Sequence, residues 1–182
     1  MPAIVEKNCS MKIETSRLYV RPYEEADLRD ALAVLGDRET MSFYPQVYSE
    51  EQVAAMIRQS IETHRRYGYG RFAVIEKLSG EFIGDCGITI QDIDGKEEHE
   101  VGYRIDKSRW GRGYALEAAA AVVKYGFEVL ALSRLCSYMA SDHRQSRRIA
   151  EKLGMTLEKQ YRNSRNRDFL TCVYEIHRDV TT

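Results

Sequence analysis

The residues best suited to chemistry in this chain form a short loop, Trp110-Gly111-Arg112-Gly113-Tyr114-Ala115. Its two glycines let the backbone turn with its amides on one side and allow an anion to approach closely. The helix expected to follow adds unpaired N-terminal amides and the positive end of its dipole. Arg109 and Arg112 supply charge-assisted donors beside the loop. The loop therefore predicts a phosphate site, and the alternative at this stage is a tight turn whose glycines serve packing.

Two better-known phosphate-binding motifs do not fit this loop. A dinucleotide fingerprint needs a third glycine at position 116, which is Leu116 here, and it normally follows a first strand. A Walker loop needs Gly-x-x-x-x-Gly-Lys followed by Ser or Thr, and the sequence holds no such string. The sequence therefore excludes both the dinucleotide-binding and the Walker type of phosphate loop.

The elements that must position the loop follow from the spacing of apolar residues. Strands are expected at 17–23, 72–76, 82–91, 97–106, 134–139, 156–160 and 169–177, and helices at 27–35, 49–67, 115–130 and 142–153. Ser49 and Gln52 form a capping box at the start of the second helix, and Gly154 ends the fourth. This order predicts an α/β (α+β) fold, a sheet with helices on both faces.

Composition narrows the class of protein. The chain has 182 residues, 43% of them hydrophobic, with 27 basic and 28 acidic side chains and a net charge of −1. We therefore expect one domain with no general attraction to nucleic acid or anionic lipid. The longest run of Ala and Val, 118–123, is too short for a membrane helix, and the charged N-terminus does not resemble a signal peptide. A cytoplasmic protein is expected.

The cysteines and histidines show no metal-binding pattern. Cys9, Cys86, Cys136 and Cys172 are spread over the chain without a Cys-x-x-Cys pair, and no histidine lies near one at ligand spacing. We expect no metal, and we interpret most of the cysteines as small buried hydrophobic residues.

Several motifs resemble a known family. The loop follows the pattern [Gln/Arg]-x-x-Gly-x-[Gly/Ala], with Gly113 and Ala115 at its last positions and Trp110 where Gln or Arg is usual. Further matches occur in order at 14–21, 82–87, 100–103 and 146–155. Together they resemble the GCN5-related N-acetyltransferases (GNAT). The residue sequence of the loop is similar to that of the RimJ/RimL-type ribosomal-protein N-terminal acetyltransferases.

The resemblance implies a fold and a co-substrate. It implies one N-acetyltransferase domain, with its core at about 14–178, built on a central mixed, mostly antiparallel sheet. That sheet would be splayed between its fourth and fifth strands, 97–106 and 134–139. Acetyl-CoA would lie in the opening, its pantetheine along the backbone near Arg104 and Ile105 and its pyrophosphate on the loop amides. The implied cofactor-binding residues are Arg104, Ile105, Arg109, Trp110, Gly111, Arg112, Gly113, Tyr114, Ala115, His143 and Ser146.

The implied reaction is attack of a neutral amine on a thioester. An α-amino group titrates at about 8, so it needs less help from a base than a lysine amine at about 10.4. The resemblance points to Glu100, which in this family often acts through a water; the alternative is a solvated carboxylate in the acidic stretch 92–100. Its neighbour His99 must face the other side of the sheet.

The acid that would protonate the departing thiolate is less clear from sequence. Many members of the superfamily carry a Tyr at the position of Ala150 here. The RimJ/RimL-type branch instead suggests Ser146, whose alternative role is to bond its own helix backbone. His143 stands where the family usually has Asn, and a histidine there could still donate to the pantetheine or cap the helix. Candidates for the acceptor pocket are Tyr44, Tyr48, Tyr67, Tyr69 and Tyr103.

These expectations favour an acetyl-CoA-dependent N-acetyltransferase acting on a primary amine, for example the N-terminal amine of a ribosomal or other protein. A small-molecule amine, such as a polyamine or an antibiotic, and a non-catalytic coenzyme A sensor stay open as alternatives. The expected partners are acetyl-CoA and the amine acceptor, with a second copy of the chain as a further candidate and no nucleic acid or membrane.

Overall fold

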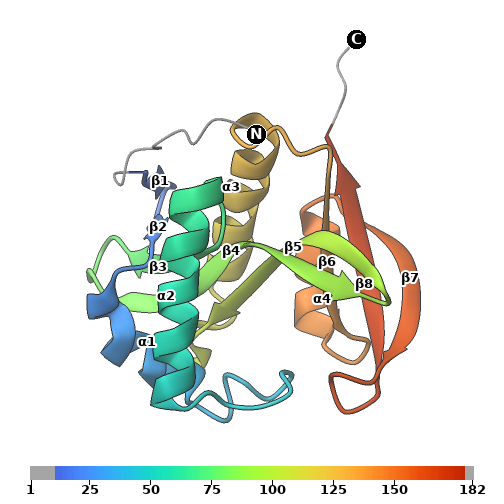
Figure 1. Ribbon diagram of the computed structural model, residues 1–182, viewed down its shortest axis with the longest axis horizontal. Helices are drawn as coiled ribbons and strands as arrows, with labels where there is room; N and C mark the ends of the chain where they lie inside the picture. Colours follow the sequence, from blue (N-terminus) through green and yellow to red (C-terminus); the bar gives the residue numbers. More distant parts are fainter. Residues whose placement is uncertain (1–10, 179–182) are drawn as a thin grey trace.

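The computed structural model describes residues 11–178, and within them eight strands form one sheet (Figure 1). Its order is β1-β2-β3-β4-β5-β6-β8-β7, and β5 and β6 are the parallel pair in an otherwise antiparallel sheet. The strands are β1 (Ile13–Glu14), β2 (Leu18–Pro22), β3 (Arg71–Glu76), β4 (Phe82–Ile93), β5 (Lys96–Ile105), β6 (Arg134–Ala140), β7 (Thr156–Asn163) and β8 (Phe169–His177).

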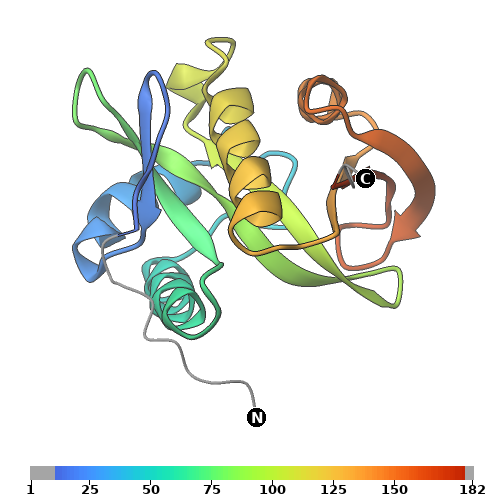
Figure 2. The same cartoon turned by 90° about the horizontal axis from the view of Figure 1, so that it is seen from above.

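The described helices cover both faces of this sheet, as predicted. They are α1 (Leu28–Leu35), α2 (Glu50–Tyr67), α3 (Tyr114–Glu128) and α4 (Arg144–Lys152). Seen from above, α2 and α3 lie on opposite sides of the central strands (Figure 2). The alternation of β3 explains the two layers, since Phe72 and Val74 pack in the cluster that contains α3 while Ala73 packs in the cluster that contains α1 and α2.

The sheet is splayed between β5 and β6, the two strands for which the sequence predicts it. Strands β4 and β5 pair continuously from Gly84–Ile105 to Ile93–Lys96. By contrast, β5 and β6 share a single paired position, Glu100 with Cys136. Beyond that position, the backbone groups of β5 and β6 do not pair with each other. A ligand can therefore enter between the two strands.

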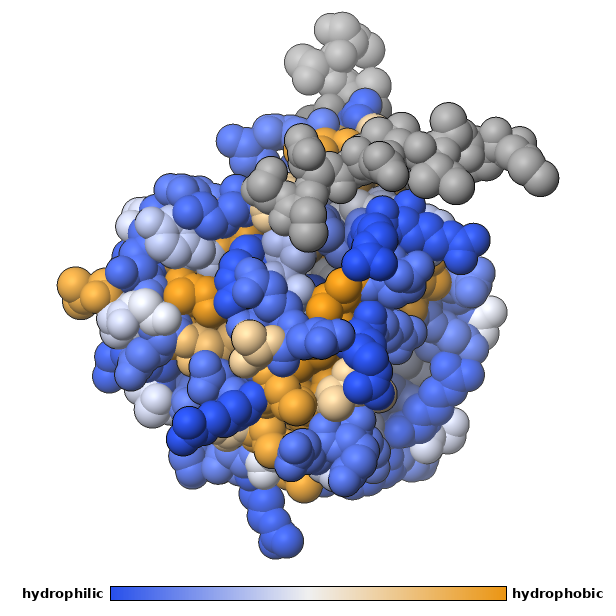
Figure 3. All heavy atoms as spheres, turned by 60° about the vertical axis from the view of Figure 1, so that its left-hand side comes forward, coloured by the Kyte–Doolittle hydropathy of each residue, from blue (hydrophilic) through white to orange (hydrophobic). Residues whose placement is uncertain are grey.

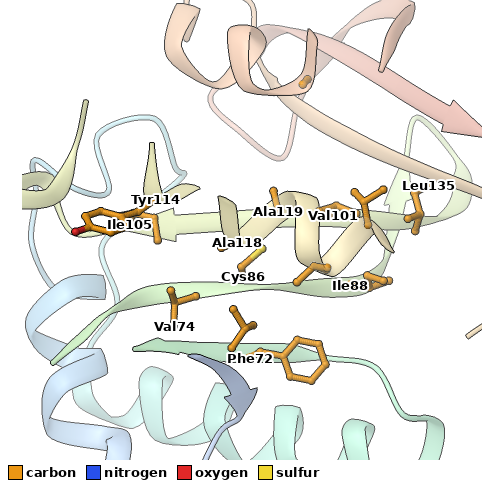
Figure 4. Close-up of a cluster of buried hydrophobic side chains, with 14 of the residues drawn as sticks. Phe72, Val74, Cys86, Ile88, Val101, Ile105, Tyr114, Ala118, Ala119 and Leu135 are labelled. Atoms are coloured by element: carbon orange, nitrogen blue, oxygen red, sulfur yellow. The ribbon is translucent and has the colours of Figure 1, made fainter. Parts of the chain in front are cut away.

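Small residues bring α3 close to the sheet (Figure 4). Ala118 and Ala119 are fully buried against a cluster that includes Cys86, Ile88 and Val101. A side chain on Gly126 would come within 3.0 Å of Ile88 and Leu135. This close packing fixes the N-terminus of α3 relative to the end of β5, which is where the glycine loop lies.

Most predicted boundaries hold within two residues, and the differences are informative. The capping box of Ser49 and Gln52 is present, and β8 begins and ends where the sequence predicts. Strand β1 is missed, because its two residues carry no periodic signal. Strand β7 continues three residues beyond the predicted end at Gln160, to Asn163. That extension brings the loop after it to the site described below.

The surface carries few large apolar groups, and the face in Figure 3 is mostly hydrophilic with apolar side chains scattered between charged ones. No helix in the stretch 11–178 has the length and apolar character needed to cross a membrane. Cys86, Cys136 and Cys172 are buried free thiols, as expected, whereas Cys9 and the rest of the N-terminal stretch discussed above lie outside the described residues.

Candidate active site

A cavity of about 420 Å³ opens beside the end of β5. One wall is the predicted loop with the start of α3, and the opposite wall is α4. The lining includes nine of the predicted cofactor-binding residues: Arg104, Ile105, Arg109, Trp110, Gly111, Gly113, Tyr114, Ala115 and His143. Ser146, predicted in two roles, lines it too. The structure therefore gathers residues 40 positions apart in sequence around one space, which we call the loop cavity.

The loop has the backbone geometry expected of an anion site. Gly111 and Gly113 both adopt the left-handed conformation, with φ of 74° and 82°, and Gly113 is the N-cap of α3. A residue with a side chain is disfavoured in this conformation, which explains the two glycines. The unpaired first amides of α3 therefore face the cavity end.

Arg17 and Glu117 hold the loop in place. The guanidinium of Arg17 donates to the carbonyl of Arg112 at 2.9 Å and to Glu117 at 2.7 Å, and it stacks over the ring of Tyr114. Burial opposes ionisation of Glu117, but hydrogen bonds from Thr15 and from Arg17 lower its pKa to about 2. The carboxylate thus stays charged and ties residues 15–17 to the first turn of α3.

Two predicted loop contacts, Arg109 and Trp110, have side-chain partners within the protein. Arg109 pairs with Glu76 at 2.8 Å and also with Glu81. The indole of Trp110 donates to the carbonyl of Ile105 at 2.7 Å. Arg112 is exposed and lies outside the cavity lining. Arg109 and Arg112 therefore remain predicted phosphate contacts, of which only Arg109 lines the cavity. Arg148 and Lys152 of α4 add two further basic groups to the lining.

His143 does not cap α4, contrary to one of its two predicted roles. It occupies the N-cap position without a side-chain capping bond. Its ring instead stacks on Phe43, with ring centres 3.8 Å apart. Burial lowers the pKa of His143 to about 4, so the ring is neutral at physiological pH. An aromatic contact has taken the place of a helix cap.

A second cavity of about 250 Å³ lies on the other side of the same strand end. It shares Tyr44, Tyr103, Arg104, His143 and Ser146 with the loop cavity. Its remaining walls come from the segment after α1, from β3, β4, β5 and β6, and from the end of β7 and the loop after it. The two cavities thus meet at a junction formed by residues of β5 and α4; we call the second one the acceptor cavity.

Glu100 faces the acceptor cavity, whereas His99 does not line it, in agreement with the predicted alternation along β5. The side chain of Glu100 accepts a hydrogen bond from Thr89 at 3.1 Å and lies 3.6 Å from the guanidinium of Arg71. Burial raises the pKa of Glu100, although Arg71 and Thr89 act in the opposite direction. A buried carboxylate with a raised pKa has the character of a general base.

Tyr103 and Ser146 are in contact at the junction. Their hydroxyl oxygens lie 2.8 Å apart, and the Tyr103 hydroxyl also lies 3.1 Å from the backbone carbonyl of Ser146. Burial raises the pKa of Tyr103 well above its usual range, so the phenol stays protonated. Ala150, the position where the family resemblance would place a Tyr, is fully buried. The phenol at the junction therefore comes from Tyr103 of β5, because α4 carries an alanine at position 150.

The five tyrosines predicted for the acceptor pocket divide into two groups. Tyr44, Tyr48 and Tyr103 line the acceptor cavity. Tyr67 and Tyr69 do not; their rings stack on each other with centres 5.6 Å apart near the end of α2. The prediction is wrong for this second pair, because Gly68 ends the helix and Gly70 turns the chain back before β3 begins.

Four further residues line the acceptor cavity, and no sequence pattern singled them out as site residues: Arg71, Gly102, Asn163 and Asn166. A side chain on Gly102 would lie 2.5 Å from Arg71 and 2.6 Å from Glu100, so the glycine leaves room for both. Asn166 donates to the carbonyl of Phe43, and Arg167 donates to the carbonyls of Ser42 and Tyr44. The basic stretch 162–167 therefore forms part of the cavity wall and contacts the segment after α1.

Comparison with protein families now identifies the chain. Residues 17–156 match the model of the acetyltransferase (GNAT) domain. The chain belongs to the GNAT family, and it is an N-acetyltransferase. In the described stretch no group of three His, Cys, Asp or Glu side chains is arranged to hold a metal ion.

Similar proteins include both sequences and structures. The uncharacterized protein YkkB of Bacillus subtilis is 31% identical over 85% of this chain and 91% of its own length. An acetyltransferase structure from Agrobacterium tumefaciens is 27% identical, covers 92% of this chain and 95% of its own, and has a TM-score of 0.77. RimL, an L7/L12 α-N-protein acetyltransferase in complex with coenzyme A, shares the fold with a TM-score of 0.76 at 20% identity, over 93% of this chain and 99% of its own.

Proposed function

We propose that acetyl-CoA binds in the loop cavity and that a primary amine enters through the acceptor cavity. The observation that carries this proposal is the junction, since both cavities share the side chains of Tyr103 and Ser146. A thioester delivered from one side therefore meets an amine delivered from the other. Residues from about 14 to 178 would form one N-acetyltransferase domain acting in the cytoplasm.

The loop residues fit a pyrophosphate. Two left-handed glycines and the N-terminus of α3 provide backbone donors, and Arg148 and Lys152 provide charge on the facing helix. Arg104 and Ile105 lie at the edge of β5 that β6 leaves unpaired, where a pantetheine amide can pair with the strand backbone. When bound there, acetyl-CoA supplies the activated acyl group.

Glu100 is the proposed base. It accepts one proton from the ammonium form of the acceptor, and the neutral nitrogen then forms a bond to the acetyl carbonyl carbon while the carbon–sulfur bond breaks. The nitrogen loses a second proton to solvent, which balances the proton gained by sulfur. The products are the N-acetyl amine and the coenzyme A thiol, and the proton on Glu100 returns to solvent.

Ser146 is the proposed donor to the departing sulfur, and Tyr103 is its positioning residue. When the phenol donates to the oxygen of Ser146, the serine hydrogen is free to point to the sulfur. Because a thiol of this kind titrates at about 8.5, protonation assists the reaction without being essential to it.

The test is an assay of thiol release with acetyl-CoA and a broad set of amines, with mass detection of the acetylated product. The set should contain peptides with free N-termini, polyamines and small amines that carry other polar groups. Release of thiol together with an acetylated amine is expected. Tight coenzyme A binding with no product from any amine would instead support the sensor alternative.

A further inference from the structure

Two residues that line the acceptor cavity carry buried polar atoms without a hydrogen-bond partner in the described part of the chain. In the part of the chain that is described, three buried side-chain polar atoms lack a hydrogen bond: Nη1 of Arg71, Oδ1 of Asn166 and Nδ1 of His64. The first two belong to residues that line the acceptor cavity. Leaving a buried donor or acceptor unpaired is unfavourable, and more so for a charged group. Two of the three residues thus line one cavity, where small movements of their side chains would let a polar ligand pair with them.

Arg71 provides a positive charge that the protein neutralises only loosely. Its side chain is 14% exposed, and its guanidinium lies 3.5 Å from Asp85 and 3.6 Å from Glu100. Both separations exceed a normal hydrogen-bond length. Asp85 is already held by Arg104, whose Nε donates to it at 2.9 Å, and by the hydroxyl of Tyr23 at 3.0 Å. The donors of Arg71 therefore remain available to a ligand in the cavity.

Arg71 and Glu100 present opposite charges side by side over Gly102. Any side chain at that position would collide with Nη2 of Arg71 and Oε1 of Glu100 at once. A ligand that carries a cation and an anion a few ångströms apart is complementary to this pair, with its anion facing Arg71 and its cation facing Glu100. The acceptor of the proposed reaction already supplies the cation, because its amine arrives as an ammonium group.

The size and cover of the cavity favour a small molecule. Its volume is about 250 Å³, below the roughly 300–1,000 Å³ of a typical drug-sized site. Asn166 donates to the carbonyl of Phe43 at 3.2 Å, which joins the loop after β7 to the segment after α1. This contact fixes the orientation of the Asn166 amide, so its Oδ1 acts as an acceptor for a further N–H or O–H group.

We propose that the acceptor is a small zwitterionic amine of the amino-acid type, with its carboxylate on Arg71 and its ammonium group on Glu100. This inference rests on the proposed function and adds the substrate class. A charged acceptor is favoured over a neutral carbonyl, because charge-assisted hydrogen bonds are roughly twice as strong as neutral ones. Asn166 accepts a hydrogen bond from the ammonium group or from a side-chain donor of the substrate.

The test compares three forms of each acceptor: the free amino acid, its carboxamide and the decarboxylated amine, in alanine, leucine and phenylalanine series. We expect kcat/KM for the amino acid to exceed that of both other forms by about 10- to 100-fold. The ammonium group of the carboxamide is more acidic than that of the amino acid, so in this comparison the intrinsic reactivity of the amine opposes the expected ranking. The carboxamide is therefore the decisive comparison.

Two variants connect the preference to the cavity. Arg71→Gln is expected to bring the ratio of amino acid to carboxamide close to one, and Arg71→Lys to restore part of it. Asn166→Asp, which adds a negative charge without a change in size, should lower the same ratio and serves if Arg71→Gln does not fold. Arg65→Gln is the matched control, because Arg65 is an exposed arginine of α2 outside the cavity lining.

The outcomes separate the two proposals. Equal or better turnover of the carboxamide or the decarboxylated amine overturns the proposal of a zwitterionic acceptor. It does not contradict the proposed acetyl transfer. A preference for the amino acid that survives in folded Arg71→Gln overturns the role of Arg71. Failure of every amine, with or without a carboxylate, removes the proposed function and this inference with it.

Discussion

The two cavities are built in different ways. The loop cavity takes most of its lining from one stretch, 103–116, and from the single helix α4. The acceptor cavity draws on segments around 43–48, 71, 91–104, 137–146 and 163–171. The first offers a ligand mainly backbone amides, which need glycines at fixed spacing. The second is lined by polar side chains, which any segment of the chain can contribute. Local motifs therefore describe the loop cavity but not the acceptor cavity.

The largest effect is expected on the acceptor side, at Glu100. Glu100→Gln should lower kcat/KM by about 100-fold or more, the usual range for loss of a general base. Because the base acts in its ionised form and burial raises its pKa, activity of the wild type should fall with decreasing pH through a midpoint above 4.5. The variant should lack this acid limb while binding coenzyme A normally. An unchanged pH profile would remove Glu100 from the mechanism.

Gly102→Ala should come next. The added methyl group must displace Arg71 and Glu100, and a misplacement of about 1 Å in an active site can cost about 100-fold in rate. We expect a fall in kcat/KM for the acceptor with the dissociation constant of coenzyme A unchanged. Gly80→Ala is a control on a remote turn, where no atom lies within 4 Å of the new carbon. If Gly102→Ala retains acceptor turnover as fully as Gly80→Ala does, the acceptor cavity does not depend on the side-chain placement described for it.

On the loop side, Gly113→Ala tests the backbone geometry. An alanine in the left-handed conformation costs about 1–2 kcal/mol, so the loop should relax away from its bound form. The dissociation constant of coenzyme A, measured by calorimetry, is expected to rise about 5- to 30-fold. The preference among acceptors should not change. A loss of acceptor preference with normal coenzyme A affinity would contradict this assignment.

At the junction, smaller effects are expected. Ser146→Ala and Tyr103→Phe should each lower kcat by about 10-fold, less than full acid catalysis provides, because the thiol is a good leaving group. KM for the acceptor should stay the same. Since the two hydroxyls form one hydrogen-bonded pair, the double variant should lose little more than either single one. Fully additive losses would show that they act independently.

The smallest effect is expected at His143. Burial lowers its pKa to about 4, so it does not change charge between pH 5 and 8. His143→Asn, which introduces the residue usual in the family, should therefore leave the shape of the pH profile unchanged over this range. A profile that loses a limb near neutrality in the variant would show that His143 titrates during turnover.

Much of the fold could be predicted because its signals are local. The capping box at Ser49 and Gln52 sets the start of α2, and Gly154 ends the last helix. The alternation along β5 correctly separated Glu100 from His99. Where the prediction was wrong, a contact between distant segments had decided the outcome. His143, for example, stacks on Phe43 instead of capping α4.

The sequence by itself determined the glycine loop and the helix start beside it, since glycine conformation and a helix N-terminus are properties of adjacent residues. Only the tertiary structure decided the acceptor side. Arg71 lies 29 positions before Glu100, and Asn166 is separated from Phe43 by 123. No local pattern links such residues, and their partners arise from strand pairing and from the splay of β5 and β6. Unpaired charge and amide groups in that space therefore became visible only in the folded molecule, because burial and missing partners are properties of packing.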